Sequence, residues 1–267
     1  MQLNYRKEGD GPVIVIIHGL YGSSDNWMSI GKKLSENHAV YIPDMRNHGR
    51  SPFAEENSYN DMRSDLAEFF ETHKIERATL LGHSMGGKAA MWFAADYPEK
   101  IQKLVIADIA PKDYTKMKER SQYNMHRSFL TAMQKVDFDK VRSRDDANEM
   151  LKGTIPDTRI RRFLLKNLTK DKIEKKYRWR INVDILFKYL EEIVGGVNTD
   201  WFDDRLPITE YPVIFIRGMN SNYIMQEDIE LIKNIYPEAG ITEISDTGHW
   251  LHAENPKKFM EAVLRCC

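Results

Sequence analysis

Short apolar runs recur along the chain and are separated by longer stretches with helical spacing. The first run, residues 13–17, reads VIVII and is typical of a strand that is buried on both faces. Further apolar runs occupy residues 39–43, 78–81, 104–107, 213–216 and 241–244. Amphipathic stretches between them, such as residues 59–72 and 88–97, predict helices. This alternation indicates an α/β fold with a mostly parallel central sheet and helices on both faces.

The alternation stops between residues 111 and 205, where the sequence contains no convincing buried strand. Residues 119–136, 145–152 and 184–194 have helical spacing instead, and Gly195 and Gly196 stand near the end of the segment. We therefore predict an α/β core formed by residues 1–110 and 206–267, and a helical insertion formed by residues 111–205.

Residues 82–86 read GHSMG and stand between a predicted strand and a predicted helix. A Gly-x-Ser-x-Gly pattern also occurs by chance in glycine-rich turns. In a strand–turn–helix context it predicts a nucleophile elbow, in which small flanking residues allow the backbone to pass close on both sides. Ser84 is therefore the candidate nucleophile of a serine hydrolase.

A serine hydroxyl needs a general base, and the base needs an acid that orients it. His249 follows the last predicted strand and fits the role of base best. His252 is expected at the start of the next structured segment. His83 is expected to point away from Ser84 and to pack, and His48 to be a hydrogen-bonded turn residue.

The acid of such a triad usually follows the strand at residues 213–216, but Asn222 stands there and no carboxylate does. A neutral amide cannot stabilise the imidazolium that forms during the reaction. Asp108, at the end of the preceding strand, is the best candidate; its alternative role is a turn or helix cap before Pro111. Three other aspartates precede the strand and so lie at its wrong end: Asp200, Asp203 and Asp204.

Two backbone amides are expected to form the oxyanion hole. One is the N–H of Met85, which follows the nucleophile directly. The other is the N–H of Leu20, in the loop HGLYG at residues 18–22 after the most apolar strand.

Charge and composition exclude several function classes. The chain has 39 basic and 40 acidic residues, a net charge of −1, so nothing indicates a global affinity for nucleic acid. The cysteines, Cys266 and Cys267, are adjacent and are expected to be reduced thiols in a frayed tail. We expect no signal peptide, no membrane span and no metal cluster, and therefore a cytoplasmic protein that is monomeric or weakly self-associating.

Positive charge gathers in residues 159–180, which hold ten Lys and Arg side chains against Asp171 and Glu174. Such a run usually forms the solvated face of a helix. The alternative is a field that steers an anionic substrate towards the site.

Three segments together resemble one group of the α/β-hydrolase superfamily. They are DMRNHGRS at residues 44–51, GHSMGGK at 82–88 and DIAP at 108–111. The chain resembles the YbfF-type esterases, whose eukaryotic relatives are the abhydrolase-domain-11 proteins. The resemblance implies hydrolysis of carboxylic esters beneath a helical cap, with acyl-CoA thioesters as further substrates. It also implies that the acid is taken from the DIAP position, which supports Asp108. The expected mechanism is an acyl-enzyme mechanism that needs no metal or cofactor.

Other readings stay open. Dehalogenases and epoxide hydrolases would need an aspartate in place of Ser84, which disfavours both. Carbon–carbon bond hydrolases and prolyl aminopeptidases also use serine. A non-catalytic ligand-binding protein on the same scaffold is a third reading, because such proteins commonly lose one member of the triad.

Overall fold

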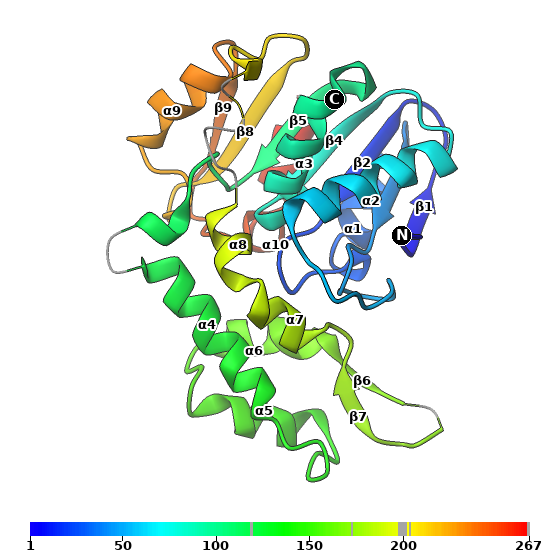
Figure 1. Cartoon of the computed structure of the whole chain (residues 1–267), viewed down its shortest axis with the longest axis vertical. Helices are drawn as coiled ribbons and strands as arrows, with labels where there is room; N and C mark the ends of the chain where they lie inside the picture. The colour runs from blue at the N-terminus through cyan, green and yellow to red at the C-terminus, as the bar shows by residue number, and fades with distance from the viewer. Residues whose placement is uncertain (118–119, 172, 197–201, 203, 266–267) are drawn as a thin grey trace.

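The computed structural model describes residues 1–117, 120–171, 173–196, 202 and 204–265. Its centre is a seven-stranded sheet in the order β1-β3-β2-β4-β5-β8-β9 (Figure 1). Six strands coincide with the apolar runs, are parallel to one another, and confirm the α/β prediction. They are β2 (Val13–Ile17), β3 (Ala39–Pro43), β4 (Ala78–His83), β5 (Ile101–Ala107), β8 (Val213–Gly218) and β9 (Gly240–Ile244).

The seventh strand, β1 (Tyr5–Glu8), was not expected from the pattern. It pairs antiparallel with β3 at the edge of the sheet, and all of its residues are exposed. An exposed edge strand carries no buried apolar run, so hydrophobic periodicity gives no signal for it.

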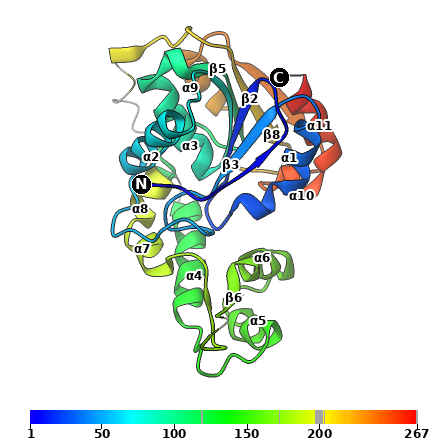
Figure 2. The ribbon, with the colours of Figure 1, turned by 90° about the vertical axis from the view of Figure 1, so that its right-hand side faces the viewer.

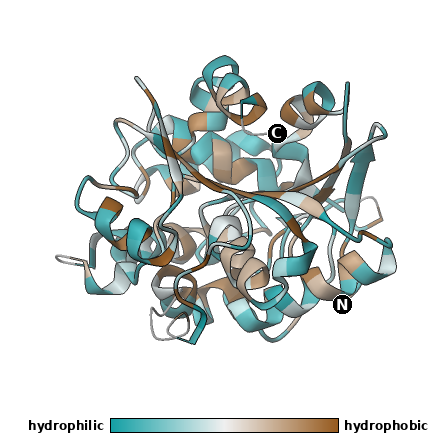
Figure 3. Cartoon of the chain, turned by 90° about the horizontal axis from the view of Figure 1, so that it is seen from above, coloured by the Kyte–Doolittle hydropathy of each residue, from teal (hydrophilic) through white to brown (hydrophobic). Residues whose placement is uncertain are grey.

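Helices cover both faces of the sheet, which Figure 3 shows as a twisted layer between them. Along β2, Val15 and Ile17 face one hydrophobic cluster and Ile14 and Ile16 face the other. The first cluster includes α2 (Tyr59–Thr72), α3 (Met85–Asp96) and α9 (Asp228–Ile235). The second includes α1 (Met28–Leu34) and α11 (Pro256–Leu264). The prediction for residues 59–72 is confirmed, whereas the helix expected from residue 88 begins three residues earlier.

Between β5 and β8 the chain forms a lobe that projects below the sheet in two perpendicular views (Figures 1 and 2). Its helices are α4 (Ser121–Gln134), α5 (Arg144–Lys152), α6 (Thr158–Leu164), α7 (Val183–Lys188) and α8 (Leu190–Gly195). The prediction of a single helix over residues 184–194 is wrong, because α7 ends before Tyr189 and α8 begins after it.

The insertion also contains a short strand pair that the sequence pattern did not predict. Strands β6 (Leu168–Lys170) and β7 (Tyr177–Trp179) form an antiparallel pair inside the basic run. Each has three residues, of which only Leu168 and Trp179 are buried, so neither produces a recognisable apolar pattern. The basic run is therefore not one helical face.

The described residues also form five short helices: η1 (Ser24–Asn26), η2 (Pro98–Lys100), η3 (Tyr114–Lys116), η5 (Leu165–Asn167) and α10 (Leu251–Glu254). Within the described ranges, no helix combines the length and apolar character needed to cross a bilayer. The same residues contain no His, Cys, Asp and Glu grouping suited to a metal ion. Four residues considered in the sequence lie outside the described ranges: Asp200, Asp203, Cys266 and Cys267.

Candidate active site

Ser84 occupies the sharp turn between β4 and α3. Its backbone has φ 54° and ψ −121°, a strained conformation for a residue with a side chain. The flanking glycines leave no room for a side chain: a Cβ on Gly82 would lie 2.4 Å from the carbonyl oxygen of Gly86, and one on Gly86 would lie 2.3 Å from that of Ile17. This tight passage is the geometry of a nucleophile elbow.

Side chains from three distant parts of the chain meet at this turn. Nε2 of His249 lies 2.9 Å from Oγ of Ser84, and Nδ1 of the same ring lies 2.8 Å from Oδ2 of Asp108. His249 belongs to the loop between β9 and α10, and Asp108 directly follows β5. The three side chains form a continuous hydrogen-bonded chain from hydroxyl to carboxylate.

Asp108 is fully buried and is held by groups from the last residue of β8 and from the loop that follows it. Its Oδ1 accepts a hydrogen bond from the Gly218 amide at 3.0 Å, and its Oδ2 accepts one from the Ser221 hydroxyl. Burial raises the pKa of Asp108 to about 6, and the hydrogen bonds from Ser221 and Gly218 oppose that rise. Ser221 was missed in the sequence; the available signal was a hydroxyl just beyond the carboxyl end of a strand.

Burial lowers the pKa of His249 well below its usual value, so the ring is neutral at pH 7. Because a carboxylate only accepts hydrogen bonds, the proton of the neutral ring belongs on Nδ1. The lone pair of Nε2 then faces the Ser84 hydroxyl. The ring is therefore in the tautomer that can accept the serine proton.

The other histidines occupy different surroundings. His83 was expected only to pack, but its Nε2 also lies 2.8 Å from the carbonyl oxygen of His249 and holds that loop. His252 stacks on Trp27 with ring centroids 4.3 Å apart. Nδ1 of His48 lies 2.9 Å from the Arg46 carbonyl oxygen, as a turn residue would.

Asn222, at the usual position of the acid, turns towards the insertion. Its side-chain oxygen accepts a hydrogen bond from Gln122 on α4 at 2.8 Å. Asp204 precedes β8 and is exposed.

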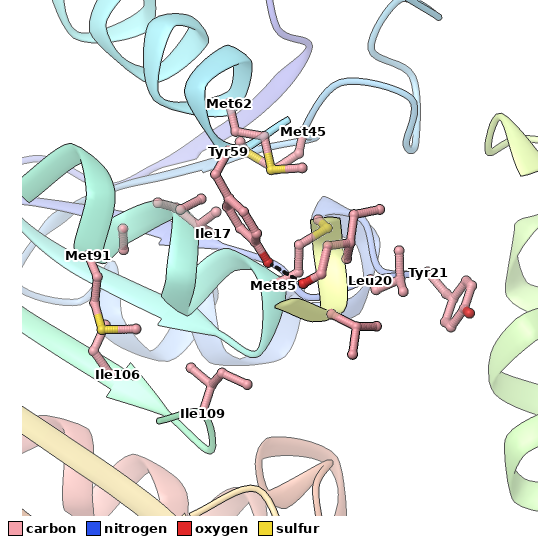
Figure 4. Close-up of a cluster of buried hydrophobic side chains, with 14 of the residues drawn as sticks. Ile17, Leu20, Tyr21, Met45, Tyr59, Met62, Met85, Met91, Ile106 and Ile109 are labelled. Atoms are coloured by element: carbon pink, nitrogen blue, oxygen red, sulfur yellow. Dashed lines mark hydrogen bonds between the residues drawn. The ribbon is translucent and has the colours of Figure 1, made fainter. Parts of the chain in front are cut away.

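A narrow cavity adjoins Ser84 and is walled mainly by apolar side chains. Leu20 and Met85, the residues expected to supply the oxyanion amides, both line it. Tyr59 closes one side: it points from α2 towards Met85 (Figure 4), and its hydroxyl donates to the carbonyl oxygen of Ile193 at 2.8 Å. The cavity measures about 20 Å³, which is room for about one water molecule.

A wider cavity, about 660 Å³, opens on the other side of His249. Trp250 lines it and packs against Phe163 of α6, with ring centroids 5.4 Å apart. Charged side chains line this cavity, three of them basic and three acidic: Arg159, Arg162 and Lys166, and Asp157, Asp246 and Glu254.

Proteins with similar sequences identify the family of this chain. The family model described as the alpha/beta hydrolase fold matches residues 12–256. The chain belongs to the α/β-hydrolase family. Esterase YbfF of Escherichia coli is 33% identical over 270 residues, covering 99% of this chain and 98% of the relative. A Danio rerio protein named sn-1-specific diacylglycerol lipase ABHD11 is 34% identical, covering 96% of this chain and 78% of the relative.

A solved structure gives the same result. A marine microorganism esterase superposes with a TM-score of 0.92 at 39% identity, covering 100% of this chain and 99% of that one. The fold and group suggested by the sequence segments are therefore confirmed, and this α/β-hydrolase is an enzyme of the esterase class.

Proposed function

We propose that Ser84, His249 and Asp108 form a catalytic triad that hydrolyses carboxylic esters through an acyl-enzyme. The observation that carries the proposal is the unbroken pair of hydrogen bonds, 2.9 Å and 2.8 Å, that links the three side chains. The strained backbone of Ser84 and the tautomer imposed on His249 support it.

In the first half of the reaction, Oγ of Ser84 attacks the acyl carbonyl and Nε2 of His249 takes the serine proton. Asp108 stabilises the resulting imidazolium through Nδ1. The backbone amides of Leu20 and Met85 hold the oxyanion of the tetrahedral intermediate. His249 then protonates the leaving oxygen as its bond to the acyl carbon breaks.

In the second half, His249 takes a proton from a water molecule, whose oxygen attacks the acyl-enzyme. Collapse of the second tetrahedral intermediate returns the proton to Ser84 and releases the carboxylic acid. Apart from the substrate and this water molecule, each step uses side chains and amides of this chain. Because the cavity beside Ser84 is small, a long acyl chain requires displacement of its walls.

We assign the structural parts accordingly: residues 1–110 and 206–267 form the hydrolase core, and residues 111–205 form its cap. The cap supplies Gln122, His126, Ile193 and Val194 to the cavity at Ser84. The core supplies the triad. Cytoplasmic location and a monomeric or weakly associating state stay predictions, to be checked by cell fractionation and sedimentation.

Labelling by a fluorophosphonate tests the triad directly. The wild-type protein should be labelled at Ser84, and Ser84→Ala should not be labelled. Turnover should appear with p-nitrophenyl esters and not with prolyl amides or carbon–carbon substrates. A folded protein that is neither labelled nor active on any ester or thioester would favour the non-catalytic binder.

Acyl-CoA thioesters are a second substrate class, supported by the charges beyond His249. Arg159, Arg162 and Lys166 line the wider cavity, although Asp157, Asp246 and Glu254 balance them formally. The neighbouring cavity shares Lys166 and is lined by three further cations against one carboxylate: Arg144, Lys170 and Arg180 against Asp25. A phosphate-bearing leaving group that reaches this second cavity would therefore meet a net positive charge.

Added salt should lower kcat/KM for acetyl-CoA much more than for p-nitrophenyl acetate. Replacing Arg162 and Lys166 by Gln should remove most of this difference. Replacing the exposed Lys175 and Arg178 by Gln removes the same charge from residues that line neither cavity, and should leave the difference in place. Equal salt responses for the two substrates would make the basic run a solvated surface.

A further inference from the structure

Tyr223 lies flat against the proposed base. The centroids of the Tyr223 and His249 rings are 3.7 Å apart, and their planes differ by 14°. Tyr223 is buried in the loop after β8, where it also lines the cavity at Ser84. A ring stacked this closely restricts tilting of the imidazole, which must keep both nitrogen atoms aligned with Ser84 and Asp108.

Two hydrogen bonds hold the backbone of Tyr223. Its amide donates to Oγ of Ser221 at 3.2 Å, and the Ser221 hydroxyl donates in turn to Asp108. Its carbonyl oxygen accepts a hydrogen bond from the Tyr114 hydroxyl, which itself accepts one from the Ala110 amide. The loop that carries the ring is thus tied to the acid and to the segment that follows β5.

The cap fixes the ring from the opposite end. The Tyr223 hydroxyl lies 3.0 Å from Nε2 of His126 on α4. Nδ1 of His126 lies 3.3 Å from the hydroxyl of Tyr21, the residue after Leu20 in the proposed oxyanion loop. Burial lowers the pKa of His126 and keeps it neutral, so one ring nitrogen donates and the other accepts. His126 therefore bridges the base side and the oxyanion side of the site.

We propose that Tyr223 and His126 are positioning residues that couple the seating of the cap to the alignment of His249. Tyr223 holds the imidazole plane, and His126 holds Tyr223 through its hydroxyl. The electron-rich face of the tyrosine also favours the imidazolium that forms during acyl transfer. The inference rests on the proposed triad and extends it to α4, so that only a correctly seated cap gives a fully aligned base.

The central test separates the stack from the hydrogen bond. Tyr223→Leu removes the stack and should lower kcat for p-nitrophenyl acetate about 10- to 100-fold, the scale of a misaligned catalytic group, with KM within about twofold. Tyr223→Phe and His126→Leu each remove the bond and should each lower kcat about three- to tenfold. The double variant should be no slower than the slower single variant, because both changes break the same bond.

A spectroscopic measurement reports the alignment itself. The low-field proton resonance of His249 Nδ1–H, identified by its loss in Asp108→Asn, should broaden or shift in Tyr223→Leu and His126→Leu. It should be unchanged in Tyr211→Phe, which removes a buried tyrosine hydroxyl away from the site. If Tyr223→Leu does not fold, the Tyr223→Phe and His126→Leu pair decides the question alone.

Three outcomes would overturn the inference. The losses of kcat could multiply in the double variant, or the variants could change KM alone. The third is a His249 proton resonance that is the same as in the wild type in both Tyr223→Leu and His126→Leu. The rate of fluorophosphonate labelling distinguishes this failure from failure of the triad. A wild-type protein that labels at Ser84 at the same rate as Tyr223→Leu refutes only the positioning role. A wild-type protein that does not label refutes the triad as well.

Discussion

Replacing Asp108 by Asn changes one atom and should disable the base while leaving the backbone intact. Asp108 has φ 51°, in the left-handed region that Asn tolerates as well as Asp does. The Asn side-chain oxygen can still accept from the Gly218 amide. Its NH₂ group then takes the place of Oδ2, 2.8 Å from Nδ1 of His249.

That NH₂ group donates to Nδ1 and forces the imidazole proton onto Nε2, where it faces Ser84. The ring can then no longer accept the serine proton, and no carboxylate stabilises the imidazolium. In serine proteases the same exchange lowers kcat by about 10⁴, which corresponds to about 5.4 kcal/mol of transition-state stabilisation. We expect a loss of this size, with KM nearly unchanged.

The assay is steady-state hydrolysis of p-nitrophenyl acetate at pH 7.5, with circular dichroism to verify folding. Asp204→Asn, the same chemical change at an exposed aspartate before β8, serves as the control and should retain wild-type kcat. A folded Asp108→Asn enzyme within about tenfold of wild type would refute the assignment of the acid and, with it, the tautomer argument.

Three further predictions concern pH and stability. Protonation of the His249–Asp108 pair removes the base, and burial raises the pKa of Asp108 to about 6. The value of kcat/KM should therefore fall as the pH drops through about 6 and stay level above pH 7. Activity that is undiminished at pH 4 would contradict this. Burial lowers the pKa of Lys88 to about 7. The unfolded chain therefore binds the ammonium proton of Lys88 more tightly than the folded protein does, and the free energy of unfolding should rise between pH 7 and 10. The urea midpoint of the wild type should show this rise relative to Lys88→Met, and midpoints that change with pH in parallel would exclude it. Gly86→Ala would place a Cβ 2.3 Å from the Ile17 carbonyl oxygen, so chemical denaturation should show a loss of about 1–3 kcal/mol or more; unchanged stability would mean that the elbow has room to adjust.

The sequence predicts those features that leave a local pattern. The run at β2 is apolar at every position, and the elbow carries its own glycines, so both are visible without a structure. Strand order leaves no such pattern. In the sheet, Ala107 pairs with Ile216, so Asp108 lies beside Gly218 and the loop that carries Ser221. This adjacency is what allows the proposed acid, which follows β5, to occupy the place usually filled after β8.

Contacts between the cap and the site were beyond sequence reasoning for the same reason. His126 lies on α4, and its partners Tyr21 and Tyr223 are 105 and 97 residues away in the chain. Helical periodicity predicts that α4 exists, but the face it presents to the core depends on the packing of the whole insertion. A neutral histidine between two tyrosines has no spacing that distinguishes it from an ordinary surface residue.

The attachment of α8 to the core determines which segments of the cap can be exchanged for those of related enzymes. Nζ of Lys88 donates to the carbonyl oxygens of Val194 and Gly195 at 2.7 Å and 2.9 Å, and Tyr59 binds the neighbouring carbonyl of Ile193. The donors lie on α3 and α2, the helices behind the elbow. A graft that replaces α5, α6 and the β6–β7 hairpin while keeping α8 would preserve these anchors. The substrate range could then change through α5, α6 and the hairpin, while α8 stays attached to the core.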